Sequence, residues 1–114
     1  MKKILLLCFL AASFTSHAKE ITREQETNCI SAMAMAEAAM TVRQNGLPLF
    51  KALENNEKML TDGNATKEEV SLMKIILRDV YSKPKYSTEK YQKEAINEYS
   101  SKYYLACMEA YESL

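Results

Sequence analysis

Two cysteines, Cys29 and Cys107, most constrain how this chain can fold, because they lie near opposite ends of the region that follows an N-terminal leader. With two cysteines in that region, one intramolecular disulfide is possible, and it joins Cys29 to Cys107. In the chain-entropy model, closing a loop of that span stabilises a fold by ~4 kcal/mol. The alternatives are two free thiols or a bond between two chains. We expect the intramolecular bond, because the count is even and the leader indicates an oxidising compartment.

The leader has the parts of a secretory signal peptide. Lys2 and Lys3 are basic, residues 4–14 are almost wholly apolar, and residues 16–18 provide small side chains at the two positions that a signal peptidase reads. The apolar run is shorter than the ~20 residues that a bilayer-spanning helix needs. We therefore expect residues 1–18 to be a signal peptide, cleaved after Ala18. Residues 19–114 would then form a single exported domain, periplasmic or secreted, with no membrane span.

Cleavage at that point would change the chemistry available to the chain. It would remove the only histidine, His17, together with Cys8. A Ser-His or Cys-His nucleophile pair could then not form, and the commonest zinc ligand would be missing. Glu94 and Glu98 have the spacing of a carboxylate pair, but they lie among lysines on what the pattern indicates to be a solvated helix face. We expect no enzyme, no catalytic residues, no cofactor and no metal site.

The charge balance gives no reason to expect a nucleic-acid partner. The whole chain has 15 basic and 15 acidic residues, and the loss of Lys2 and Lys3 would leave the exported domain slightly acidic. Bulk attraction to a polyanion needs a clustered basic surface, which this composition does not indicate.

Glycines and prolines divide the exported domain into four segments of helical length. They lie at Gly46, Pro48, Gly63 and Pro84. The first segment opens on a capping-box pattern, Thr22 with Gln25, and ends at Asn45-Gly46, a typical left-handed stop. Between them, helical spacing places four side chains on one face, namely Cys29, Met33, Ala36 and Met40.

The other three segments also read as helices. The second starts with Pro48 in its first turn, and the third starts at a capping box formed by Thr66 and Glu69. The fourth is capped by Ser87 or Thr88. Their expected buried residues are Leu49, Phe50, Leu53 and Leu60 in the second, Val70, Met73, Leu77 and Val80 in the third, and Ile96, Tyr99, Tyr103, Ala106 and Ala110 in the fourth.

These segments predict an all-α fold, a small four-helix domain closed by one disulfide between its first and last helices. Cys29 lies near the start of the first helix and Cys107 near the end of the last. An antiparallel or steeply crossed packing of those two helices would bring the cysteines together.

The tyrosines are the main sign of a binding surface. All seven lie in the last third of the chain, and four of them do not all fit the expected buried stripe: Tyr86, Tyr91, Tyr104 and Tyr111. Tyrosine is enriched at protein interfaces. We hypothesise a partner-binding face formed by these four residues, with Arg43 and Gln44 at the end of the first helix as further members. The partner would be another protein.

Five short motifs, taken together and in order, resemble a known group. They are Cys29, Arg43-Gln44-Asn45-Gly46, Tyr81-Ser82-Lys83-Pro84-Lys85-Tyr86, Ala95-Ile96-Asn97-Glu98-Tyr99 and Tyr103-Tyr104-Leu105-Ala106-Cys107. The pattern is similar to a loose group of short exported proteins of prophages and gammaproteobacteria. This resemblance implies a periplasmic setting and a phage or prophage origin, and it carries over no activity and no site residue.

Two classes of function fit these expectations. The first is a small periplasmic partner-binding or inhibitor-type protein that blocks an envelope enzyme, phage-entry machinery or a toxin. The second is a periplasmic chaperone or structural envelope protein, similar in size and single-disulfide helical build to the small acid-stress chaperones.

Overall fold

The computed structural model describes residues 20–114, so the expected signal peptide lies outside the described residues. These residues form four α-helices and no strand: α1 (Arg23–Gln44), α2 (Leu49–Thr61), α3 (Lys67–Val80) and α4 (Glu89–Glu112). The all-α, four-helix prediction is confirmed.

Local sequence rules set most of the helix ends. Both expected capping boxes form, because the Thr22 and Thr66 hydroxyls accept the backbone N–H of the residues three positions later, at 3.1 and 3.2 Å. Gly46 ends α1 with a φ of +82°, where a Cβ would be strained. The N–H of Leu47 then bonds back to the Val42 carbonyl at 3.1 Å, as in a Schellman motif. Thr88 is the N-cap residue of α4, but its side chain makes no capping bond.

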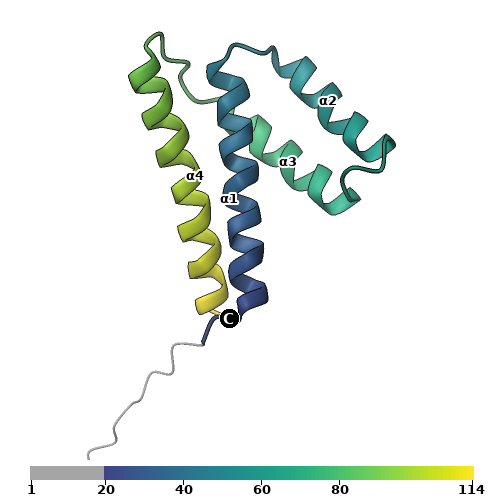
Figure 1. Cartoon of the computed structure of the whole chain (residues 1–114), viewed down its shortest axis with the longest axis vertical. Coiled ribbons are helices and arrows are strands. Elements are labelled where there is room, and N and C mark those ends of the chain that lie inside the picture. Colours follow the sequence, from purple (N-terminus) through teal and green to yellow (C-terminus); the bar gives the residue numbers. More distant parts are fainter. Residues whose placement is uncertain (1–19) are drawn as a thin grey trace, which may run out of the picture.

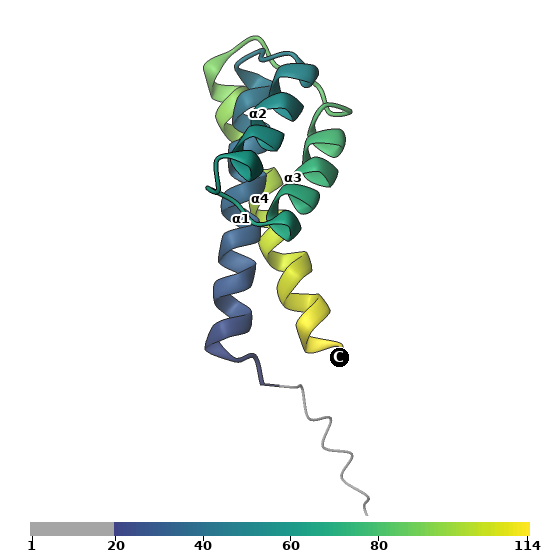
Figure 2. The same cartoon turned by 90° about the vertical axis from the view of Figure 1, so that its right-hand side faces the viewer.

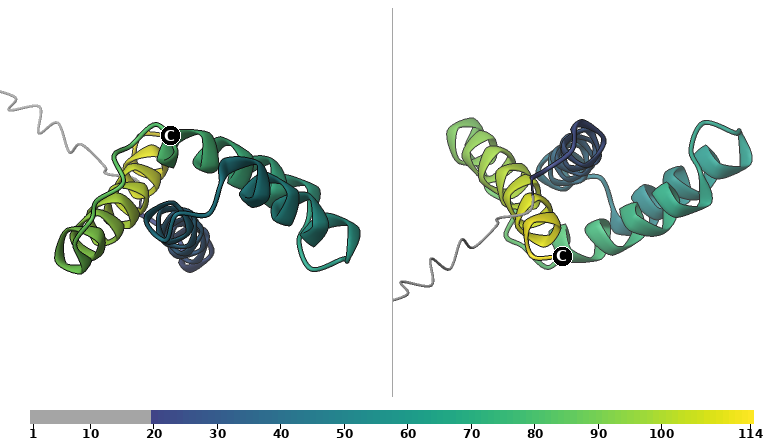
Figure 3. Two further views of the ribbon diagram at one scale, coloured as in Figure 1. Left: turned by 90° about the horizontal axis from the view of Figure 1, so that it is seen from above. Right: turned by 90° about the horizontal axis from the view of Figure 1, so that it is seen from below.

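α1 is the central helix of the fold. It runs antiparallel to α4 on one side, and a hairpin formed by α2 and α3 lies on its other side (Figures 1 and 3). The helices therefore contact one another in the order α4, α1, α3, α2. The hairpin covers only the half of α1 nearer its C-terminus, and the opposite ends of α1 and α4 extend beyond it as a two-helix pair (Figures 1 and 2).

The disulfide lies in this two-helix pair. Cys29 of α1 and Cys107 of α4 are bonded, with 5.4 Å between their Cα atoms, which confirms the expected pairing. In antiparallel helices with equal rise per residue, the register that pairs Cys29 with Cys107 brings Ala36 level with Ser100. Both are small and buried. Small side chains at this level let the two helices pack closely without a thick apolar layer between them.

The α2–α3 hairpin is held to the fold mainly through α3. Ile76, Leu77 and Val80 of α3 are buried against α1 in the core cluster, to which α2 contributes Ala52. Within the hairpin, the buried side chain of Asn56 donates an Nδ2 hydrogen bond to the Val70 carbonyl at 2.9 Å. α2 thus buries a narrow stripe of small and polar side chains.

The expected buried face of α2 is wrong in two places. Phe50 is 63% exposed and Leu60 is also exposed, whereas Ala52 and Asn56 are buried. α2 packs mainly against α3, so one side of the helix is left uncovered. The apolar pattern of the sequence carries no information on whether another helix covers that side of α2.

The expected buried face of α4 is confirmed for Tyr99, with Ile96 and Tyr103 packed against the core, but it is wrong toward the C-terminus. Ala106 and Ala110 are exposed, and Ser100 is buried instead. The cause is the disulfide, because Cys107 must face Cys29, and this direction also points Ser100 at α1. Apolar spacing alone favoured the stripe on which the alanines lie.

Replacing both cysteines with serine should destabilise the protein by up to about 4 kcal/mol. This is the stabilisation that the chain-entropy model gives for a disulfide that closes a loop of this length. The measurement is the free energy of unfolding in urea. Chemically reduced wild-type protein is the matched control and should give the same loss. If neither the double substitution nor the reduction lowers the free energy of unfolding, the bond has no stabilising role.

Candidate functional site

The structure separates the four tyrosines of the hypothesised face into two pairs. Tyr86, in the loop that joins α3 to α4, and Tyr91, in the first turn of α4, have ring centroids 6.2 Å apart. Tyr104 and Tyr111 point about 140° and 160° away from Tyr91 around the α4 axis, given 100° per residue. Tyr111 faces α1, since its hydroxyl accepts a hydrogen bond from Asn28 Nδ2 at 3.2 Å. One continuous tyrosine face therefore does not form.

Gln44 lies inside the protein and not on a surface. Its side chain is only 2% exposed. The amide Nε2 donates to the Pro84 carbonyl at 2.9 Å, and the amide oxygen accepts the backbone N–H of Tyr86 at 2.8 Å. A single buried carboxamide thus fixes the α3–α4 loop on both sides of Lys85, and it fixes the backbone of Tyr86 directly.

Arg43, which is partly buried near the end of α1, holds the same loop. Its Nε and Nη2 atoms both donate to the Lys83 carbonyl, at 3.2 and 3.1 Å. Its guanidinium also lies 5.2 Å from the centroid of the Tyr81 ring, within cation–π range. Tyr81 in turn donates its hydroxyl to the Leu47 carbonyl. Gln44 therefore positions Tyr86 and is too buried to serve as a contact surface, whereas Arg43 holds Lys83 and stays partly exposed.

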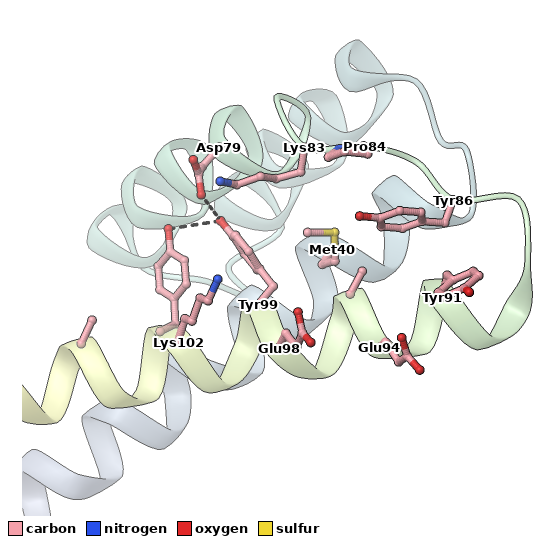
Figure 4. Close-up of a pocket in the computed structure, with 13 residues that line it drawn as sticks. Met40, Asp79, Lys83, Pro84, Tyr86, Tyr91, Glu94, Glu98, Tyr99 and Lys102 are labelled. Carbon is pink, nitrogen blue, oxygen red and sulfur yellow. Dashed lines mark hydrogen bonds between the residues drawn. The ribbon is translucent and has the colours of Figure 1, made fainter.

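The fixed loop, the end of α3 and one face of α4 enclose a cleft of about 640 Å³, which we call the tyrosine cleft (Figure 4). Along α4 its lining residues recur every three or four positions over four turns. The lining consists of Met40, Asp79, Lys83, Pro84, Tyr86, Tyr91, Glu94, Ala95, Glu98, Tyr99, Lys102, Tyr103 and Ala106.

Tyr99 connects the cleft wall to α3. Its hydroxyl donates to Asp79 Oδ2 at 2.6 Å and lies 3.4 Å from the Tyr103 hydroxyl, and the two rings are 5.1 Å apart (Figure 4). Burial and the hydrogen bond to Asp79 raise the pKa of Tyr99 above its ordinary value. The hydroxyl therefore stays protonated, and it links α4 to α3 in the wall of the cleft.

Charges divide the cleft into two ends. Figure 4 shows Lys83 and Lys102 toward the Asp79 end, whereas Glu94 lies toward Tyr86 and Tyr91, and Glu98 lies between the two ends, next to Tyr99. A concave surface with aromatic walls and a few polar groups is typical of a binding site. The arrangement can hold a polypeptide segment by apolar contact and orient it by charge.

Sequence reasoning missed most of this lining. Glu94 and Glu98 read as a solvated face, and Tyr99 as plain core. One signal was present: Ala95, Tyr99 and Ala106 form a second apolar stripe beside the stripe that faces α1. A helix with two adjacent apolar stripes covers two neighbours, or one neighbour and a cleft.

No helix among residues 20–114 is long and apolar enough to cross a membrane. In the same part of the chain, histidine, cysteine, aspartate and glutamate side chains form no group of three placed to hold a metal ion. Comparison with protein-family models, curated proteins and solved structures finds no match to this chain. The site must therefore be interpreted from its own geometry.

Replacing Gln44 with alanine should cost about 2 kcal/mol or more, because it leaves the Pro84 carbonyl and the Tyr86 N–H without a partner in a part-buried place. The free energy of unfolding in urea measures the loss. Gln92→Ala is the matched control, because Gln92 bonds the same loop through one exposed contact to the Tyr86 carbonyl. A Gln44→Ala loss no larger than the control would argue against the positioning role.

Alkaline pH should reveal the raised pKa of Tyr99 as a loss of stability. Because its folded pKa is raised, the folded state keeps a proton that the unfolded state releases above about pH 10, so stability falls as pH rises through that range. One such group changes stability by up to about 1.4 kcal/mol per pH unit. Tyr99→Phe should flatten the decline of unfolding free energy with pH. The control Tyr104→Phe should keep the wild-type slope, and equal slopes in both variants would contradict the assignment.

Proposed function

We propose that this chain is a small exported partner-binding protein, and that the tyrosine cleft is where its protein partner docks. The observation that carries the proposal is the fixed, exposed pair of rings at the cleft mouth. Tyr86 and Tyr91 remain 39% and 53% exposed, although the buried Gln44 side chain holds the backbone of Tyr86.

Preorganisation supports this interpretation. A binding loop that is already ordered loses little conformational entropy when a partner docks. Four hydrogen bonds from Arg43 and Gln44 order residues 83–86 in the free chain. Tyrosine rings on such a loop add contact area with few rotatable bonds, which is why they act as anchors in protein interfaces.

The cellular setting is part of the proposal. The Cys29–Cys107 disulfide suits an oxidising compartment, as does the expected signal peptide over residues 1–18. Together with the resemblance to short exported prophage proteins, this favours a partner in the cell envelope, such as an envelope enzyme, phage-entry machinery or a toxin that the protein would block.

The test is affinity capture from periplasmic extract with the immobilised protein. We expect one stoichiometric partner, lost at least tenfold when Tyr86 and Tyr91 are both changed to alanine, because anchor residues of this type dominate binding energy. Phe50→Ala is the matched control, since Phe50 is an aromatic ring that is more exposed than either tyrosine but lies on α2, outside the cleft.

Three outcomes would contradict the proposal. Capture that survives the double tyrosine change but is lost with Phe50→Ala would move the binding site to α2. Capture of many substoichiometric proteins, indifferent to both variants, would favour the chaperone alternative. Absence of any captured protein would remove the support for a soluble envelope partner.

A further inference from the structure

The end of the tyrosine cleft that carries Tyr86 and Tyr91 has a specific chemistry, and we call it the acidic end. The two rings are tilted by 44° to one another, so they form an open wedge and not a stacked pair. Glu94 lies three residues after Tyr91 on α4 and borders the wedge, and Glu98 follows one turn further along the same helix face, next to Tyr99 (Figure 4).

The two carboxylates of the acidic end have no ion-pair partner within 4.0 Å among residues 20–114. The cleft lysines lie toward the opposite end, because Lys83 extends toward Asp79 and Lys102 lies one turn beyond Glu98 (Figure 4). Lys90 Nζ lies 6.0 Å from the centroid of Tyr91, at the outer limit of a cation–π contact. The acidic end therefore combines aromatic faces with two carboxylates that form no close ion pair.

We propose that the acidic end binds an arginine side chain of the protein partner. This inference rests on the proposed function and specifies the chemistry of the same site. A guanidinium is planar, so it can stack on a tyrosine ring while its N–H groups pair with a carboxylate. Glu94 and Glu98 supply the carboxylates, and Tyr86 and Tyr91 supply the ring faces.

The same chemistry already operates within this chain. Arg43 lies over the Tyr81 ring at 5.2 Å and donates two hydrogen bonds to the Lys83 carbonyl. Its guanidinium thus uses its face and its edge at once. The acidic end offers an incoming guanidinium stronger acceptors, because a hydrogen bond to a carboxylate is roughly twice as strong as one between neutral groups.

Other occupants fit the acidic end less well. An aliphatic side chain would cover the rings but would desolvate Glu94 and Glu98 without a partner, which is costly. An acidic side chain would be repelled by both. A lysine would neutralise one carboxylate, but its compact ammonium group cannot stack on a ring in the way that a planar guanidinium does.

The first experiment is a titration of the purified, disulfide-bonded protein with N-acetyl-arginine amide, followed by NMR. Shifts should concentrate on Tyr86, Tyr91, Glu94 and Glu98 and should saturate. N-acetyl-citrulline amide is the matched probe, because it has nearly the same shape without the charge. We expect it to bind about fivefold more weakly or worse, the size of a partly exposed charge interaction.

Variants locate the effect on the carboxylates. Glu94→Gln with Glu98→Gln should weaken the arginine probe about threefold to tenfold and leave the citrulline probe unchanged. Glu109→Gln with Glu112→Gln removes the same charge from exposed positions of α4 outside the cleft, and it should change neither probe. Lys90→Gln should strengthen arginine binding, since it removes a competing cation from Tyr91.

Each opposite result overturns the inference. It fails if the two probes bind equally, if shifts fall outside the acidic end, or if the two glutamine pairs act alike. The capture experiment separates this failure from a failure of the proposed function. A partner lost with the tyrosine variants but kept when Glu94 and Glu98 are changed would leave the docking site standing and exclude its arginine.

Discussion

The buried carboxamide of Gln44 is the interaction on which both the fold and the cleft depend. It lies at the end of α1, the central helix, and it bonds the Pro84 carbonyl and the Tyr86 N–H on the neighbouring loop. That loop must carry the chain from α3, on one side of α1, to α4 on the other (Figure 1). Leaving this amide unpaired inside the protein would cost free energy. The loop therefore has one favoured position, and that position defines the mouth of the cleft.

The two ends of the α1–α4 pair are stabilised in different ways. Near Gln44, all four helices contribute side chains to one core, which includes Met40 and Tyr99. At the far end no other helix covers the pair, and the Cys29–Cys107 bond together with the Asn28–Tyr111 contact joins it. The covalent bond replaces burial where the fold is only two helices thick. It also sets the rotation of α4, and that rotation turns Ala95 and Tyr99 toward the cleft.

Much of the fold was predictable because local rules decide it. Capping boxes at Thr22 and Thr66 and the stop at Gly46 depend on residues a few positions apart, and each formed as expected. The disulfide was predictable because Cys29 and Cys107 are the two cysteines of the described residues and can form one intramolecular bond. The exposure of Phe50 was not, because it depends on whether a neighbouring helix covers α2, and helical spacing carries no information on that point. For the site, Tyr86 and Tyr91 were identified, whereas Gln44 was assigned to a surface and is buried.

The amino-acid sequence by itself determined that this protein is all-α, where its four helices lie and which two cysteines pair. Only the tertiary structure decided which side of each helix faces a neighbour. It placed Gln44 in the core, separated Tyr104 and Tyr111 from the other two tyrosines, and set Glu94 and Glu98 beside exposed rings. The physical reason is range: helix formation is settled by contacts within four residues, but a cleft is made by segments about forty residues apart in the chain, such as Gln44 and Tyr86.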